Sequence, residues 1–149
     1  MLSADLLFDL REFAHASLFA ADRPVWSALQ DLKNYMDGYV YARHLFRRLA
    51  DGVTAQKHLV LHAGSLIEAN QCHIEYGKTL HGGLVITRAG EVLQGASLIM
   101  AGSVLLGDRI AIGQGVLVEG GAPIKSPAVI GDLTEVRQGA YLRGYCLIG

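Results

Sequence analysis

The stretch LGDRIAIGQGVLVEGGAPIKSPAVIGDLTEVRQGAYLRGYCLIG, residues 106–149, decides the fold. An aliphatic residue recurs in it at every sixth position, without a break. These positions are Leu106, Ile112, Val118, Ile124, Ile130, Val136, Leu142 and Ile148. The residues two before each of the last seven are mostly small: Ile110, Val116, Ala122, Ala128, Thr134, Ala140 and Cys146. A period of six fits neither an α-helix nor an ordinary hairpin sheet, so it indicates a repeat architecture.

This repeat predicts an all-β solenoid, a left-handed parallel β-helix of hexapeptide repeats. Each hexad would make one strand and one corner, and three strands would close a coil of about 18 residues. Because side chains alternate along a strand, the aliphatic residue and the residue two before it should point inward. Glycines between the predicted strands suit the corners. The alternative is an antiparallel sandwich, whose strands also alternate but whose loops would vary in length.

The rest of the chain predicts a helical N-terminal cap over residues 1–52 and a β-helix over residues 53–149. Ser3 is a plausible N-cap for a first helix, and a second should start at Pro24 and stop at Gly38. Residues 39–50 are ambiguous between helix and strand. The coils should be irregular over 53–103 and regular over 104–149. The six-residue spacing already begins before the regular coils, at Ile86, Val92, Leu98 and Val104. The polar segment EYGKTLHGG (Glu75–Gly83), within residues 72–84, is the expected excursion.

Composition excludes several function classes. The chain has 149 residues, a net charge of −1 and no stripe of basic residues, so neither nucleic acid nor an anionic membrane is an expected partner. The N-terminus shows no basic leader followed by a long apolar stretch, so we expect a cytoplasmic protein. Cys72 and Cys146 form no zinc or disulfide pattern, and Cys146 falls on an inward position.

The outward positions predict an interface. Residues 18 apart stack on the same face of the predicted prism, and one face shows Ala111, Val129 and Leu147. An apolar stripe on a solenoid face usually marks an interface rather than solvent. We therefore expect this face to pack against two further copies of the chain in a homotrimer.

The run VEGGAPIKSPAVIGDLTEVRQGAYLRGYCLIG (Val118–Gly149) resembles the hexapeptide-repeat acyltransferases, most closely the glucosamine-1-phosphate acetyltransferase and sugar-phosphate nucleotidyltransferase group. FDLREFAHASL (Phe8–Leu18) and PVWSALQDLKNY (Pro24–Tyr35) resemble the N-terminal segment of stand-alone members. The resemblance implies a trimer that transfers an acetyl group from acetyl-CoA to the nitrogen of an amino sugar or sugar phosphate. The chain carries no Gly-rich nucleotide-binding loop, so a nucleotidyltransferase domain is not expected.

The resemblance also implies substrate-binding residues. Arg137 stands in an Arg-x-Gly-Ala context like that of a basic residue that binds the sugar phosphate in this family. A guanidinium suits this role because it makes bidentate, permanently charged contacts to phosphate. A solvated corner arginine is the alternative interpretation. Arg143, Lys125 and Tyr141 are weaker candidates.

The catalytic residue stays unknown, because no histidine follows His81 and the family's general base is a histidine of the regular coils. His81, beside two glycines, is a weak candidate for a substitute base, and a loop residue without a catalytic role is the simpler interpretation. The chain also stops in mid-repeat. We therefore expect either a transferase that is truncated and inactive or, as the alternative, a non-catalytic trimeric scaffold or carbohydrate-binding module.

A metal-dependent enzyme of this architecture, such as a γ-type carbonic anhydrase, would need three converging histidines. His62, His73 and His81 could supply the ligands, but their spacings of 11 and 8 do not follow the hexad. We predict no metal site.

Overall fold

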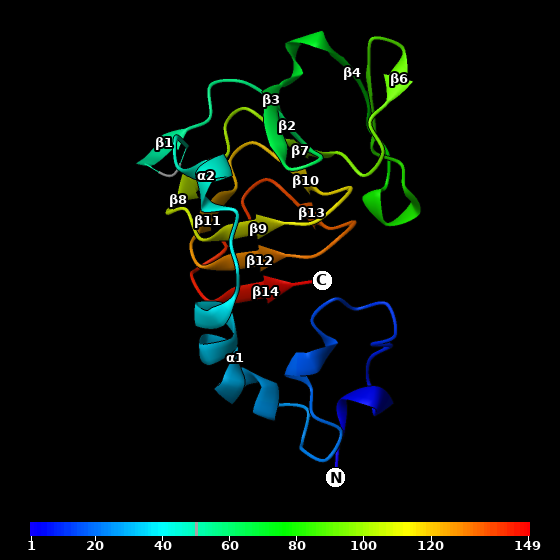
Figure 1. The fold of residues 1–149 in the computed structure, drawn as a ribbon, viewed down its shortest axis with the longest axis vertical. Helices are drawn as coiled ribbons and strands as arrows, with labels where there is room; N and C mark the ends of the chain where they lie inside the picture. The colour runs from blue at the N-terminus through cyan, green and yellow to red at the C-terminus, as the bar shows by residue number, and fades with distance from the viewer. Residues whose placement is uncertain (50) are drawn as a thin grey trace. The chain divides into compact units, whose positions relative to one another are not determined.

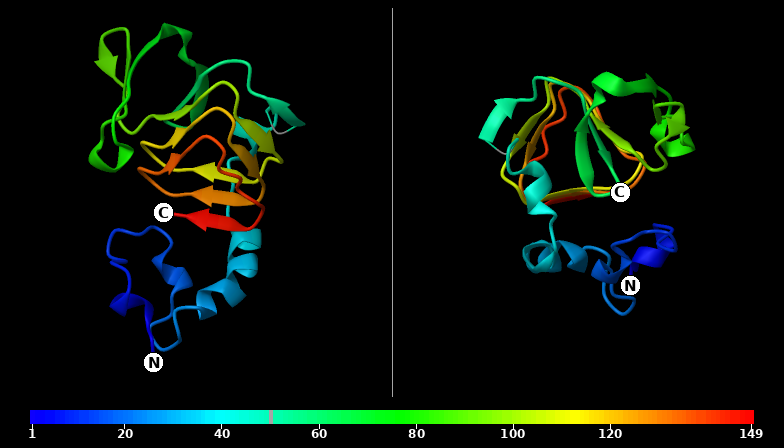
Figure 2. Two further views of the ribbon diagram at one scale, coloured as in Figure 1. Left: turned by 180° about the vertical axis from the view of Figure 1, so that it is seen from behind. Right: turned by 45° about the horizontal axis from the view of Figure 1, so that its top comes forward.

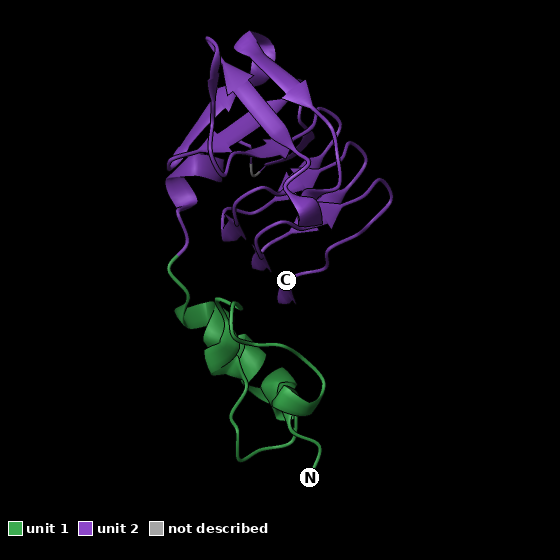
Figure 3. Ribbon diagram, turned by 90° about the vertical axis from the view of Figure 1, so that its right-hand side faces the viewer, with its two compact units in different colours: residues 1–40 green, residues 41–149 purple. Residues whose placement is uncertain are grey.

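The computed structural model describes residues 1–49 and 51–149. Contacts divide them into two compact units, Met1–Val40 and Tyr41–Gly149 (Figure 3). Of the ambiguous segment 39–50, the part Arg43–Phe46 forms the short helix α2, and Ala50 lies outside the described residues. Strands dominate the second unit, whereas the first is built from helical turns and one longer helix.

The first unit contains helix α1 (Ser27–Gly38) and two 3-10 turns, η1 (Ala4–Leu6) and η2 (Ala16–Leu18). The predicted helix after Ser3 is wrong, because only a single turn forms and the Ser3 side chain makes no capping hydrogen bond. The predicted second helix is present, although it begins at Ser27, three residues after Pro24. It follows Pro24, whose carbonyl accepts a hydrogen bond from the Ser27 amide, and it ends at Gly38.

A hydrogen-bonded histidine–tyrosine pair links the turn before η2 to α1 in the first unit. His15 is buried, and its Nδ1 lies 2.7 Å from the hydroxyl oxygen of Tyr35. Burial raises the pKa of Tyr35. The apolar side chains of α1 and its N-cap are buried only in part, since Met36 is fully covered whereas Trp26 and Leu29 are exposed.

Parallel pairings dominate the C-terminal half of the second unit (Figure 1). β7 (Ser97–Ile99) pairs with β10 (Leu117–Val118), β8 (Val104–Leu106) with β11 (Pro123–Lys125), and β9 (Ile110–Ile112) with β12 (Ala128–Ile130). β13 (Glu135–Val136) adds to β10, and β14 (Cys146–Ile148) adds to β12. Figure 2 shows β9, β12 and β14 side by side.

The other strands of this unit pair antiparallel. β1 (Asp51–Thr54) pairs with β8, and β2 (Leu59–His62) lies between β7 and β3 (Ser65–Glu68). A short 3-10 turn, η3 (Ala69–Gln71), leads to β4 (Cys72–Glu75). β4 forms a separate antiparallel sheet with β5 (Val85–Arg88) and β6 (Glu91–Val92).

The predicted left-handed parallel β-helix is therefore wrong, because the sheets are mixed. Among the sheets of the described residues, only β14–β12–β9 is parallel throughout, and β4–β5–β6 is antiparallel throughout. Tight turns account for two of the antiparallel pairings, β2–β3 and β5–β6. Ala63 and Gly64 join β2 to β3, and Ala89 and Gly90 join β5 to β6, all four with positive φ. Such two-residue turns reverse the chain and leave no room for the crossover that parallel pairing needs.

The inward positions of the hexad pattern are largely confirmed. One buried cluster contains nine of the predicted inward residues: Ile110, Val116, Val118, Ala122, Ile124, Ala128, Ile130, Val136 and Leu142. Each fully buried aliphatic side chain of this kind contributes about 1.5–3 kcal/mol to stability. Cys146 packs against this cluster, is half-buried rather than buried, and has a thiol pKa raised by burial. It and Cys72 are free thiols.

Leu106 departs from the pattern. Its side chain is 38% exposed, whereas Leu105 is 3% exposed and belongs to the buried cluster. The turn from β8 to β9 has three residues, one more than the turn from β11 to β12. Leu105 therefore pairs with Ile124, 19 positions away, whereas Ala111 pairs with Val129, 18 positions away.

A second apolar cluster covers the outer face of the β7–β10 pair. Leu98 and Leu117 point away from the first cluster, and both are buried in the second together with Ile86. The other buried members are Val60, Ala69, Leu84 and Ala96. Leu117 is thus buried by strands that precede the regular repeat.

The predicted excursion at Glu75–Gly83 is the connection between β4 and β5. It contains the 3-10 turn η4 (Thr79–His81). The two sides of the loop come close together at Gly77 and Gly83, which we call its neck. A Cβ built on Gly83 would lie 2.7 Å from the Lys78 amide nitrogen, and one on Gly77 would lie 2.7 Å from the Gly83 carbonyl oxygen. Only glycine therefore fits at both sides of the neck.

Thr79 fastens this loop to the turn before β13. Its side chain is buried, its hydroxyl donates to the Leu133 carbonyl at 2.6 Å, and its amide donates to Glu135 Oε1 at 3.1 Å. The loop is therefore held by a residue that no sequence pattern singled out.

We expect Thr79→Val to lower the free energy of unfolding by about 0.5–1.5 kcal/mol, because the hydrogen bond from the buried Thr79 hydroxyl to the Leu133 carbonyl is lost. Urea denaturation of the full chain measures this loss. Thr54→Val is the matched control, since Thr54 is exposed. Equal losses in the two variants would contradict the anchoring role.

Candidate functional site

Three of the four predicted substrate-binding residues lie on β11 or on the segment around Leu142 that a single bridge joins to β11. Ile124 and Leu142 are buried and joined by a parallel bridge, and the Lys125 amide donates to the Leu142 carbonyl at 2.8 Å. Because side chains alternate along strands, the residues on either side of this buried pair face outward. The outward set on these two segments is Pro123, Lys125, Tyr141 and Arg143. We refer to it as the cationic face.

The cationic face is open and continues onto β8. Val104 pairs with Pro123 and Leu106 pairs with Lys125, so the exposed side chain of Leu106 lies beside Lys125. Tyr141 is 59% exposed. An aromatic ring and two cations thus stand together on an accessible sheet surface.

Lys125 and Arg143 are neighbours without an acidic partner. Neighbouring strands lie about 4.8 Å apart, and Lys125 and Arg143 each directly follow one member of the isolated parallel bridge Ile124–Leu142, so they stand on adjacent segments and on the same face. Across the described chain, neither side chain makes an ion pair or a hydrogen bond. Like charges side by side on a sheet are unfavourable, so an anion between them would be stabilising.

Arg137, the first-ranked candidate, is engaged elsewhere. Its Nε and Nη2 donate to Glu135 Oε2 at 3.1 and 2.9 Å, and its side chain is otherwise exposed. Hydrogen bonding to Glu135 raises the pKa of Arg137. The structure therefore gives this guanidinium a carboxylate partner within the chain. Glu135 and Arg137 are two apart, a spacing that puts side chains on one face of a strand, so the sequence carried a signal for the pair.

Glu135 links Arg137 to the loop of Thr79. The Thr79 amide and the Arg137 guanidinium both donate to its carboxylate, and they lower the pKa of Glu135 below its ordinary value of 4.5. The folded state thus favours the charged carboxylate. The stability that Glu135 contributes is present above its unfolded pKa and is lost as the pH falls through the folded pKa.

We expect Glu135→Gln to lower stability at pH 7 and to make stability less sensitive to acid, because glutamine can still accept from Thr79 but carries no charge. Urea denaturation at pH values from 7 to below 4.5 measures both effects. Glu91→Gln serves as control, since Glu91 is exposed on β6. Parallel pH profiles for wild type and Glu135→Gln would contradict this assignment.

His81, the weak catalytic candidate, is exposed at the end of η4. Its loop is held against Leu133 and Glu135, next to β13, which belongs to a different sheet from β11. The structure therefore does not bring His81 onto the cationic face.

The predicted trimer stripe lies in register on one sheet. Ala111 pairs with Val129, and Val129 pairs with Leu147. Val129 is only 1% exposed in the single chain, and the other two side chains are half-buried. The stripe is thus partly covered without a second copy, and the homotrimer stays a prediction.

Metal ligands do not cluster in the described part of the chain. Among residues 1–49 and 51–149, no three histidine, cysteine, aspartate or glutamate side chains are grouped so that they could hold a metal ion. His73 instead lies 3.7 Å from Glu75. No helix in the same residues combines the length and hydrophobicity needed to cross a membrane.

Comparison with known proteins found nothing. No protein-family model, curated protein or solved structure matches this chain. The resemblance to hexapeptide-repeat acyltransferases, together with the cytoplasmic location, therefore stays a prediction.

Proposed function

We propose that this chain binds a sugar phosphate on the cationic face. The observation that carries the proposal is the pair Lys125 and Arg143, adjacent, outward-facing and without an acidic partner, beside the exposed ring of Tyr141.

The chemistry of the three side chains fits such a ligand. A phosphate placed between Lys125 and Arg143 relieves their mutual repulsion, and the guanidinium can hold two phosphate oxygens at once. The ring of Tyr141 offers an apolar surface for the C–H face of a sugar and a hydroxyl for a hydrogen bond. Leu106 extends the apolar part of the face beside Lys125.

Calorimetric titration with glucose 1-phosphate and with glucose tests the proposal. We expect glucose 1-phosphate to bind more tightly, and binding to weaken as salt is added. Lys125→Ala and Arg143→Ala should each reduce affinity about tenfold, because each removes a charge-assisted hydrogen bond.

Lys78→Ala is the matched control, since Lys78 is an exposed lysine in the β4–β5 loop, away from the cationic face. Equal affinity for the two sugars would overturn the proposal. An effect of Lys78→Ala as large as that of Lys125→Ala would overturn it as well.

Acetyl transfer from acetyl-CoA to glucosamine 1-phosphate stays a prediction from the resemblance, and the binding proposal does not depend on it. We expect the chain to release no thiol above background from these two compounds, because His81 lies in a loop held against β13 and not on the cationic face. Thiol release that His81→Ala abolishes would contradict this expectation and make His81 the base.

A further inference from the structure

A separate concave surface lies at the turns that follow β9 and β12. A groove of about 600 Å³ is formed entirely by residues of the second unit. Its lining is Leu45, Leu61, His62, Ala63, Gly64, Gln94, Gly95, Ile112, Gly113, Gln114 and Asp132. A smaller groove of about 360 Å³ continues from it and shares Gln94, Gly95, Gln114 and Asp132. None of the residues of the cationic face lines either groove.

Stacked turns place three polar side chains in a row where the grooves meet. The Gly115 amide donates to the Gly95 carbonyl at 3.2 Å, and the Leu133 amide donates to the Gln114 carbonyl at 2.8 Å. The Gln114 amide donates to Asp132 Oδ1 at 2.7 Å. Gln94, Gln114 and Asp132 therefore come from successive turns that are hydrogen-bonded to one another.

Two glycines keep this row in place. A Cβ at Gly95 would lie 2.7 Å from Gln114 Oε1, and a Cβ at Gly113 would lie 2.7 Å from the Asp132 amide nitrogen. Gly95 also has a φ of +68°, which side chains rarely adopt. The positions of Gln114 and Asp132 thus depend on the absence of side chains next to them.

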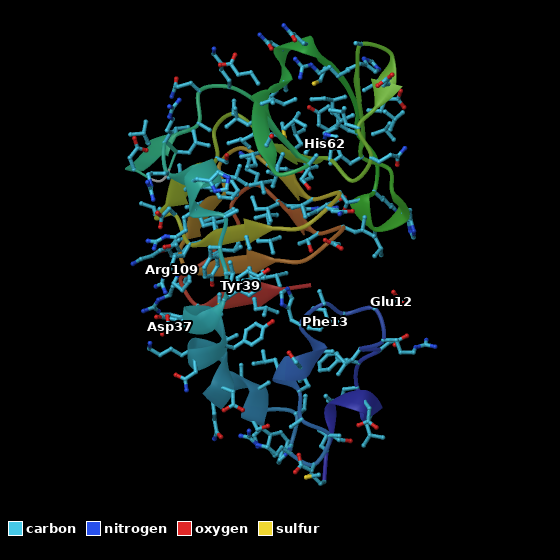
Figure 4. All side chains as sticks on the ribbon, in the orientation of Figure 1. Glu12, Phe13, Asp37, Tyr39, His62 and Arg109 are labelled. Carbon is cyan, nitrogen blue, oxygen red and sulfur yellow. The ribbon has the colours of Figure 1, made fainter. Side chains whose placement is uncertain are left out.

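The polar groups of the larger groove have unused hydrogen-bonding capacity. His62, labelled in Figure 4, is the last residue of β2 and is half-buried. Within the described residues, the side chains of His62, Gln94 and Gln114 have no hydrogen-bonding partner. Asp132 uses Oδ1 for the Gln114 amide, which leaves Oδ2 available to a ligand.

The floor of the groove is apolar. Leu45 of α2, Leu61 of β2 and Ile112 of β9 contribute to the lining, and all three are half-buried against the first core cluster. An imidazole, two amides and a carboxylate thus surround a patch of aliphatic side chains. The lining contains no lysine or arginine.

From this arrangement we propose that the groove binds an uncharged hexose unit. Adjacent hydroxyl groups of a pyranose donate to a carboxylate and exchange hydrogen bonds with amides, and the C–H face of the ring packs on aliphatic side chains. Asp132 would accept from the sugar hydroxyls, Gln94 and Gln114 would both donate and accept, and Leu61 and Ile112 would contact the ring. A phosphate is disfavoured because the charged group in the lining is the Asp132 carboxylate, which repels another anion.

NMR titration of the full chain with maltose, cellobiose and lactose tests the proposal. We expect at least one disaccharide to shift the side-chain amide signals of Gln94 and Gln114 and the ring signals of His62 in a saturable manner. Asp132→Asn should weaken that binding about tenfold, because asparagine still accepts from the Gln114 amide but has lost the charge. Glu91→Gln is the matched control on a carboxylate outside both grooves.

Two further results separate this site from the cationic face. Lys125→Ala should leave disaccharide binding unchanged, so failure of the sugar-phosphate proposal does not decide this one. Gly113→Ala, checked for folding by circular dichroism, should weaken binding because its Cβ displaces Asp132. The proposal is overturned if none of the three disaccharides shifts these signals, or if Asp132→Asn binds as tightly as Glu91→Gln.

Discussion

The second unit depends on aliphatic side chains that stack between parallel strands 18 or 19 residues apart in the sequence. Ile110, Ala128 and Cys146 are paired in one such row, and Ile112, Ile130 and Ile148 in another. Burial of each large member contributes about 1.5–3 kcal/mol, which adds up over successive rows to a large share of the stability. The pairing also fixes which residues face outward, because side chains alternate along every strand. Both proposed sites are consequences of this register.

The antiparallel strands have a different structural role. They cover the outer face of β7 and β10 with a second apolar cluster, so this pair is buried on both sides. The β4–β5 loop is then fixed at Thr79, which ties it to Leu133 and Glu135. The two clusters border the turns that carry Gln114 and Asp132. The larger groove has Ile112 and Leu61 of the first cluster in its lining, and the smaller one has Leu84 and Ile86 of the second.

The sequence predicted the inward rows because a six-residue period survives wherever turns have constant length. It failed at Leu106, where the turn Gly107–Arg109 is one residue longer than Ser126–Pro127. It also failed on strand direction, because Ala63 and Ala89 adopt positive φ in the tight turns that reverse the chain. Alanine is rare in such turns, so the residue type gave no warning.

The sites, like the fold, could be predicted from the sequence only in part. Outward alternation around Ile124 and Leu142 was sufficient to bring Lys125 and Arg143 together. The partner of Arg137 could have been read from Glu135, two positions before it. The groove at Asp132 could not have been predicted from the sequence, because it depends on β2 and α2 lying over turns that are distant in the sequence.

The narrow neck of the β4–β5 loop restricts how the sequence of this protein can evolve. Gly77 and Gly83 exclude each other's side chains, so neither can be replaced while the other segment stays where it is. Lys78, Leu80 and His81 are exposed and are free of this restriction. The tip can therefore diversify one residue at a time, whereas the neck can be altered only by exchanging the loop as a block. Such a loop is a natural unit for grafting, with Thr79 as the residue that a replacement must reproduce.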